Sequence, residues 1–200
     1  MLMDTPDAAT VLADALASGD GDAVFAALHD MLLFKSVKPL APADLDAVAG
    51  VIGRGGRAAE TALQVLYVAA VREGTLPAER EAAAGRVRAF LEGACDDPEG
   101  RAAVRHAIVL LACMDDPAVI RQLAYDAPHF DGERVRKEDY LHPAMAKMLR
   151  RHDADLAALQ ASLGETRSAA DLGEVREYGR DPAAYEERVR RAQEDEVEVL

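Results

Sequence analysis

The stretch GRAAETALQVL, residues 56–66, decides the fold, because a second stretch, GRAAVRHAIVL, residues 100–110, begins in the same way. The two stretches start 44 residues apart. That offset is within the range of about 40–47 residues that separates successive units in arrays of paired helices. The sequence therefore predicts a protein that is built from repeated helix pairs.

The composition favours helices throughout the chain. Half of the 200 residues are apolar, yet only five are Tyr, four are Phe and none is Trp. Alanine and leucine supply the apolar material instead. Alanine has the best intrinsic helix propensity and lets helices pack closely, whereas the β-branched residues that favour strands are scarce. We therefore expect an all-α protein.

Capping residues, glycines and prolines divide the chain into about ten helices. Gly74 stands where a C′ glycine would end a long apolar helix, and the segment from Thr75 to Pro77 is expected to cap the next one. Residues 126–137 break the helical pattern and form a connector. The expected helices lie near residues 6–17, 22–34, 42–52, 57–73, 77–93, 98–114, 117–125, 138–151, 154–163, 169–178 and 182–194.

Two Asp-Asp-Pro sequences begin at Asp96 and Asp115, 19 residues apart. Residues 97–125 resemble a HEAT repeat: Asp-Pro opens the helix, a Val-Arg pair follows at Val104 and Arg105, and Ala and Leu occupy the packed face. Residues 56–91 resemble the motif more loosely. The resemblance to HEAT and armadillo proteins implies a right-handed α-solenoid of antiparallel helix pairs. The alternative is an irregular helical bundle.

The domain organisation follows from this pattern and from the charge of the C-terminal part. We expect a helical repeat domain over residues 1–163. The last 50 residues hold 13 acidic against 7 basic residues. Residues 164–200 are therefore expected to form an acidic helical extension that packs on the repeats or trails from them.

The net charge is −13, from 36 acidic and 23 basic residues. An acidic surface repels phosphate backbones, so nucleic acid is not the expected partner. The same field would speed association with a basic protein, although acidity also serves simply to keep a chain soluble.

Cysteine usage and apolar runs indicate the compartment. The two cysteines, Cys95 and Cys113, lack any metal-ligand spacing and are expected to be free buried thiols in a reducing environment. The N-terminal residues lack the pattern of a secretory signal, and no apolar run is long enough to cross a bilayer. We expect a cytoplasmic protein with no membrane partner.

No constellation of residues defines a catalytic, cofactor-binding or metal site. The Gly-rich loop at residues 53–56 has no preceding strand and no Lys-Ser/Thr after it, so we interpret it as a turn. His152-Asp153 resembles the pair of helical HD phosphohydrolases, with His129 or His142 and Asp171 as further ligands, but helix order and spacing do not support it. Asp139 and His142 share a helical face, yet two ligands do not make a site.

The most unusual local composition lies between Tyr125 and His152, which we call the basic island. Residues 132–152 hold six basic and three acidic residues. Tyr and Arg are the residue types that concentrate binding energy at interfaces. The island is interpreted as a docking patch, as an intramolecular clasp for the acidic tail, or as a solvated connector. The candidate partner-binding residues are Tyr125, Arg134, Arg136, Lys137 and Tyr140.

The sequence favours a non-enzymatic protein–protein interaction module of a bacterial type, such as an adaptor, a scaffold or an immunity protein. Stacked helix pairs expose a long face built from their second helices, which suits a protein ligand. An enzyme or a nucleic-acid-processing protein on a HEAT-like scaffold is the alternative. A concave groove lined by Arg57, Arg101, Arg105 and the basic residues of 134–151 would favour an anionic or nucleic-acid ligand, whereas acidic residues there would favour a basic protein.

Overall fold

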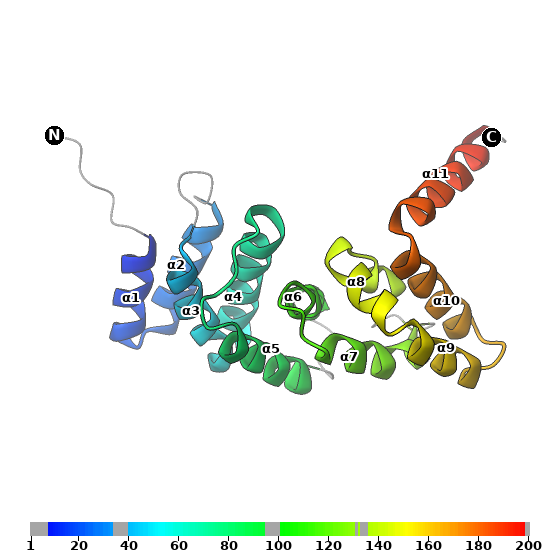
Figure 1. The fold of residues 1–200 in the computed structure, drawn as a ribbon. Helices are drawn as coiled ribbons and strands as arrows, with labels where there is room; N and C mark the ends of the chain where they lie inside the picture. Colours follow the sequence, from blue (N-terminus) through cyan, green and yellow to red (C-terminus); the bar gives the residue numbers. More distant parts are fainter. Residues whose placement is uncertain (1–7, 34–39, 95–100, 131, 133–135, 199–200) are drawn as a thin grey trace. The chain divides into compact units, whose positions relative to one another are not determined.

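The computed structural model describes residues 8–33, 40–94, 101–130, 132 and 136–198. These residues form eleven α-helices joined by short 3₁₀ and π-helical turns, and they contain no strand (Figure 1). The expectation of an all-α protein is confirmed. The chain divides into two compact units, Met1–Met114 and Asp115–Leu200, and we describe each of them by itself.

Unit 1 contains six α-helices, and two of them are followed by a short turn of another helix type. The 3₁₀ turn η1 (Ile52–Arg54) follows α3, and the π-helical turn η2 (Ala69–Glu73) continues α4. The α-helices are α1 (Ala8–Ser18), α2 (Gly21–Leu33), α3 (Pro42–Val51), α4 (Gly56–Val68), α5 (Arg80–Ala94) and α6 (Arg101–Cys113).

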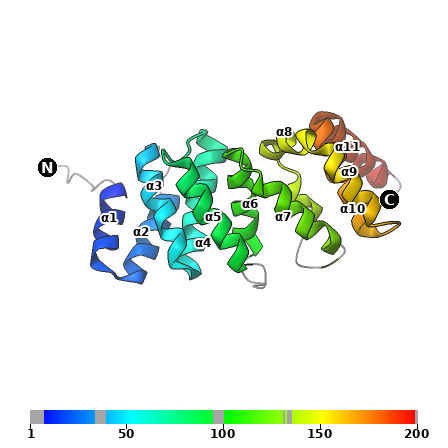
Figure 2. The same cartoon turned by 60° about the horizontal axis from the view of Figure 1, so that its bottom comes forward.

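The helices of unit 1 contact one another in two rows (Figures 1 and 2). In one row α2 contacts α4, and α4 contacts α6; in the other, α3 contacts α5. Successive helices pair across the rows, as α1 with α2, α3 with α4, and α5 with α6. Each second helix therefore lies beside the second helix of the next pair.

The 44-residue offset of the sequence places buried residues of α4 onto buried residues of α6. Because α4 and α6 are also neighbours in one row, the two similar stretches occupy similar positions in successive helix pairs. The matched buried residues are Ala59, Leu63, Val65 and Leu66 in α4 and Ala103, Ala107, Val109 and Leu110 in α6.

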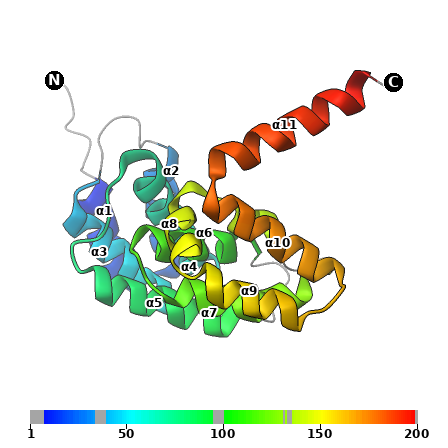
Figure 3. The same cartoon turned by 45° about the vertical axis from the view of Figure 1, so that its right-hand side comes forward.

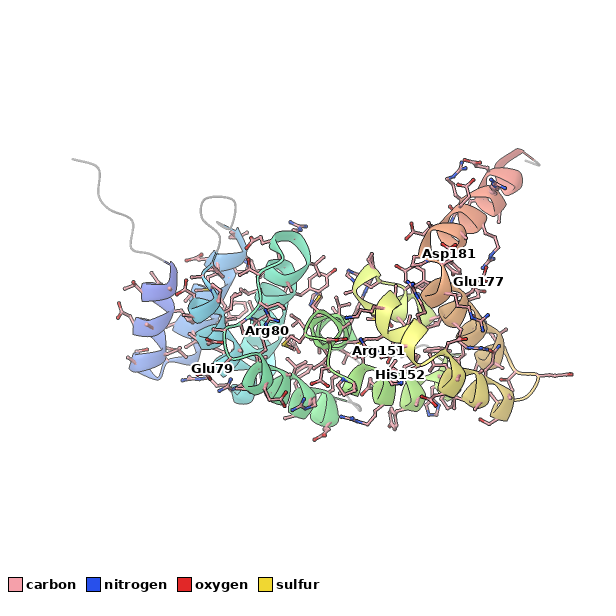
Figure 4. All side chains as sticks on the ribbon, viewed as in Figure 1. Glu79, Arg80, Arg151, His152, Glu177 and Asp181 are labelled. Carbon is pink, nitrogen blue, oxygen red and sulfur yellow. The ribbon has the colours of Figure 1, made fainter. Side chains whose placement is uncertain are left out.

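Of the two helix boundaries expected between residues 73 and 80, the end at Gly74 agrees with the structure and the start of the next helix does not. Gly74 adopts the left-handed conformation, with φ of 66°, and ends the helix as expected. The segment from Thr75 to Pro77 does not begin the next helix, which starts at Arg80. The backbone N–H of Glu79 donates to Asp46 Oδ1 of α3 at 2.9 Å, so a distant helix caps α5. Figure 4 labels Glu79 and Arg80 at the start of α5.

Unit 2 is arranged around one helix, α10 (Arg167–Arg180), which contacts most of the other elements (Figure 3). The turn η3 follows α7 and the turn η4 precedes α8. The remaining elements are α7 (Ala118–Asp126), η3 (Ala127–His129), η4 (Lys137–Tyr140), α8 (Pro143–Arg151), α9 (Asp153–Ser162) and α11 (Pro182–Glu198).

Gly179 lets α8 approach α10 closely. A Cβ atom added to Gly179 would lie 2.4 Å from Leu149 Cβ of α8. Within unit 2, α10 packs on both α8 and α9. The domain boundary expected after residue 163 stays a prediction.

The helix expected over residues 138–151 is interrupted. Residues 137–140 form the turn η4, and α8 begins at Pro143 with His142 as its N-cap residue. A proline lacks the N–H of a helix interior and disfavours helical geometry in the residue before it, so a helix cannot run smoothly through this point.

Among the helices of the described ranges, none is both long and apolar enough to cross a bilayer.

Candidate functional site

Lys137 of the basic island forms ion pairs within unit 2. Its Nζ lies 3.0 Å from Asp171 Oδ1 and 2.9 Å from Glu174 Oε1, both on α10. Burial alone would lower the pKa of Lys137, but the hydrogen bonds to the two carboxylates outweigh it and the pKa is raised. These ion pairs therefore connect η4 to α10.

Two cations of α8 have a common acidic partner. Arg151 and Lys147 lie 3.3 Å and 3.6 Å from oxygens of Asp115. The hydrogen bond from Arg151 is the main reason that the pKa of the Asp115 carboxyl is lowered. Figure 4 labels Arg151 near the end of α8. These cations, like Lys137, have carboxylate partners within unit 2.

Tyr140 belongs to the core of unit 2. Its side chain is 0% exposed, its ring centroid lies 5.9 Å from that of Phe130, and its hydroxyl donates to Asp126 Oδ2 at 2.5 Å. Gln122 Nε2 also donates to Asp126, at 3.0 Å. Burial raises the pKa of Asp126, and the hydrogen bond from Tyr140 opposes that rise.

The other candidate contacts of the basic island fall into three places. Tyr125 is 58% exposed on α7, and its ring meets that of His129 edge-on with centroids 6.3 Å apart. Arg136 is exposed beside η4. Arg134 lies outside the described residues. Of the five candidates, Tyr125 and Arg136 are exposed at the surface. Lys137 forms ion pairs within unit 2, and Tyr140 is buried.

The residues considered for a metal site have other roles. Asp139 Oδ2 accepts from the backbone N–H of Arg136 at 3.2 Å, and His142 Nδ1 accepts from that of Ala144 at 3.2 Å, so both cap helical turns. Asp153 is held by Arg176 and Arg180 of α10. Within the described part of the chain, no group of three or more His, Cys, Asp or Glu side chains could hold a metal.

The Gly-rich loop connects two helical elements, and Cys113 is the one cysteine among the described residues. Gly55 and Gly56 have positive φ, 71° and 56°, and connect η1 to α4. Cys113 is a half-buried free thiol whose pKa is raised by burial, and Cys95 lies outside the described residues. A surface pocket at the α9–α10 turn includes Arg176, whose guanidinium is bound by Asp153 and Gln160.

Unit 1 carries a surface that sequence patterns did not single out, on the row formed by α2, α4 and α6. We call it the second-helix face. Its aromatic, imidazole and guanidinium groups are exposed or half-buried, and each helix of the row contributes at least one. The face comprises Phe25, His29 and Leu33 of α2, Arg57 and Tyr67 of α4, and His106 of α6.

Side chains of the second-helix face contact one another across helix boundaries. The guanidinium of Arg57 lies 4.6 Å above the ring of Phe25, joining α4 to α2. The rings of Tyr67 and His106 lie 4.5 Å apart, joining α4 to α6. Burial and, secondarily, the charge of Arg105 lower the pKa of His106, so its imidazole is neutral at pH 7.

An exposed apolar group extends the face along α2. Leu33 is 61% exposed and lies one helical turn beyond His29. Phe25 and Tyr67 are both half-buried, each at the edge of the apolar stripe of its helix. An aromatic residue at a stripe edge, on each of two neighbouring helices, is the signal that could have marked this face.

Comparison of the chain with protein-family models, with curated proteins and with solved structures finds no match. A proposal about function therefore rests on the surfaces described above.

Proposed function

We propose that the chain is a non-enzymatic protein-interaction module that binds a protein segment through its second-helix face. The observation that carries this proposal is the set of aromatic and cationic contacts that link three neighbouring helices at a solvent-accessible surface. Aromatic and arginine side chains provide most of the binding energy at protein interfaces. In a free protein they rarely gather on one face without a role.

A HEAT-like solenoid is our proposed architecture for unit 1. The two rows of contacts and the buried residues that match at the 44-residue offset support it. Solenoids bind ligands along the surface that their stacked second helices present. We do not extend the solenoid to unit 2, where the helices gather around α10 rather than in rows.

A protein ligand fits the charges of the face better than a nucleic acid does. Arg57 and Arg105 are exposed on α4 and α6, but Asp22 and Glu60 lie at neighbouring positions of α2 and α4. The side chain of Arg101 lies outside the described residues. A mixed set of charges does not give the positive groove that phosphate binding needs. The net charge of −13 favours a basic protein.

The test compares two variants with the same change of charge. Arg57→Glu alters the second-helix face, whereas Arg80→Glu alters an exposed position at the start of α5, in the other row. Tagged wild-type chain and each variant are used to capture proteins from the organism that encodes the chain, and the recovered proteins are quantified. We expect one stoichiometric partner with the wild-type and Arg80→Glu chains, and at least a tenfold loss with Arg57→Glu.

Circular dichroism of both variants guards against misfolding, since an exposed substitution should change stability by less than about 0.5 kcal/mol. Equal recovery with Arg57→Glu and Arg80→Glu would reject the second-helix face. A chain that captures no stoichiometric protein at all would reject the interaction module.

A further inference from the structure

The outward side of α2 carries apolar and acidic side chains but no lysine or arginine. The residues that α2 buries in unit 1 are Val24, Ala27, Leu28 and Met31. Residues on the other side of the helix also recur at helical spacing, and they are exposed or half-buried. We call them the α2 surface, which comprises Asp22, Phe25, Ala26, His29, Asp30 and Leu33.

Apolar groups of the α2 surface are accessible to a partner. Figures 1 and 2 show α1 and α2 at one end of unit 1. Leu33 is 61% exposed at the C-terminal end of α2, and Ala26 is exposed two turns before it. Phe25 is half-buried: the guanidinium of Arg57 lies 4.6 Å from its ring centroid, and the ring of His29 stacks on it at 6.0 Å. These groups form a short apolar strip along the helix, and burying such a strip against a partner is favourable.

The charged side chains of α1 and α2 are all negative. Residues 1–34 include six Asp but no Glu, Lys or Arg. Asp14, Asp22 and Asp30 are exposed, and none of the three forms an ion pair with another described residue. The neighbouring helix α4 adds one cation and one carboxylate, Arg57 and Glu60, so the local charge stays negative. An apolar strip flanked by such carboxylates is complementary to a basic amphipathic segment.

The spacing on α2 favours a helical partner. Asp22, Ala26 and Asp30 follow one another at intervals of four residues and so form one ridge of the helix. Leu33 lies at the end of the same side. A second helix that runs along α2 repeats its own side chains at the same interval of about 6 Å. Its apolar and basic side chains therefore meet the apolar and acidic groups of α2 in register.

We propose that the α2 surface binds a basic amphipathic helix of another protein. A large apolar side chain of that helix packs on Leu33 and Ala26, and lysine or arginine side chains beside it approach Asp22 and Asp30. The inference rests on the proposed function, because α2 is part of the second-helix face, and it adds the chemistry of the partner. A nucleic acid, an anionic membrane or a second copy of this chain would bring negative charge against these carboxylates, which is unfavourable.

The experiment measures binding of a labelled helical peptide to the full chain by fluorescence anisotropy. The probe is an amphipathic peptide of leucine and lysine, and its counterpart has glutamate in place of every lysine. We expect the lysine peptide to bind the wild-type chain with a dissociation constant on the order of 10–100 µM, and the glutamate peptide to show no binding at about 500 µM. Leu33→Ser and Asp30→Lys should each weaken binding of the lysine peptide by at least about fivefold.

Two matched controls separate the α2 surface from the general acidity of the chain. Tyr125→Ser removes an exposed apolar side chain of unit 2, and Glu92→Lys makes the same change of charge at an exposed position near the end of α5. Both should bind the lysine peptide as the wild-type chain does. All four substitutions are at exposed positions, so the fold should persist, which circular dichroism checks.

Three outcomes would overturn the inference. The lysine peptide fails to bind, the control variants lose as much affinity as the α2 variants, or either α2 variant binds as tightly as the wild-type chain. Any of these, together with loss of the captured partner in Arg57→Glu, leaves the proposed function standing. A chain that captures no protein rejects the proposed function and this inference with it.

Discussion

The hydrogen bond from Tyr140 to Asp126 should make a measurable contribution to the stability of unit 2. The hydroxyl donates to Asp126 Oδ2 at 2.5 Å, and both residues are buried. Tyr140→Phe keeps the ring and its packing but removes the donor. Asp126 then retains the 3.0 Å hydrogen bond from Gln122. The substitution thus isolates the contribution of one hydrogen bond to a buried carboxylate.

The expected loss follows from the charge of the acceptor. A hydrogen bond to a charged group contributes about 1.5–3 kcal/mol, because its removal leaves a buried carboxylate poorly solvated. The variant should therefore lose about 1.5–3 kcal/mol of unfolding free energy at pH 8. The same loss raises the pKa of Asp126 further in the variant, because the ionised carboxylate loses more than the protonated carboxyl does when the donor is removed.

The sign of the pH dependence follows from the same pKa. Burial raises the pKa of Asp126 in the folded protein, so the folded state binds this proton more tightly than the unfolded state does. Ionising Asp126 therefore costs stability as pH rises through its folded pKa. Tyr140→Phe raises that pKa further, so its cost should appear as pH rises and should shrink toward acidic pH, where Asp126 is protonated in both proteins.

Urea unfolding at about pH 3, below the ordinary pKa of an aspartate, and at about pH 8 measures this difference. Other carboxylates titrate equally in both proteins and cancel when the two are compared. In an Asp126→Asn background, Tyr140→Phe should cost less than about 1 kcal/mol, because the acceptor is no longer charged. Tyr125→Phe, at an exposed position, is the control and should change stability by less than about 0.5 kcal/mol. A loss at Tyr140 that is the same at both pH values and in both backgrounds would refute the reasoning.

Three further predictions concern stability and can be measured by thermal or urea unfolding. Tyr178→Phe should be neutral or stabilising by up to about 1 kcal/mol, because the buried hydroxyl has no hydrogen-bond partner among the described residues; a loss of that size would contradict this. Gly179→Ala should cost about 1–3 kcal/mol, since its Cβ would strike Leu149 at 2.4 Å. A Cβ atom added at Gly50 would have no atom within 4 Å, so Gly50→Ala should raise the unfolding free energy by about 0.5–1 kcal/mol. Equal effects of the two glycine substitutions would contradict this reasoning. Lys137→Gln should cost about 1 kcal/mol near pH 7 and less as pH falls through the lowered pKa of its partner Glu174, whose protonation removes that ion pair; a cost that does not vary with pH would exclude the ion pairs as its cause.

Helices could be predicted from the sequence because the signals for them are local. Gly74 ends η2 in the left-handed conformation, as its position indicated. The start of α5 could not be found in the same way, because its cap is Asp46, 33 residues earlier in the chain. Pro143 is visible in the sequence and marks a helix start. The prediction of one continuous helix over 138–151 was wrong because it gave more weight to the helical periodicity on either side than to this proline.

Which residues are exposed was harder to predict than where the helices lie, because residue type alone does not reveal burial. Tyr140 and Tyr125 are the same residue type in one short region, yet one is 0% and the other 58% exposed. Lys137 was proposed as a partner contact, but Asp171 and Glu174 come from a helix 30 residues further on. Which carboxylate a lysine finds depends on tertiary packing, and packing is not encoded in local composition.

The two units differ in the residues that bring their helices together, and this difference limits how far a repeat can extend. In unit 1 the matched positions of α4 and α6 hold Ala, Val and Leu, so equivalent helices can stack with equivalent spacing. In unit 2 a single close approach at Gly179 and ion pairs to Lys137 and Asp153 gather unlike elements around α10. A stacked array requires contacts that recur along the chain. This is why the repeat architecture is proposed for unit 1 alone.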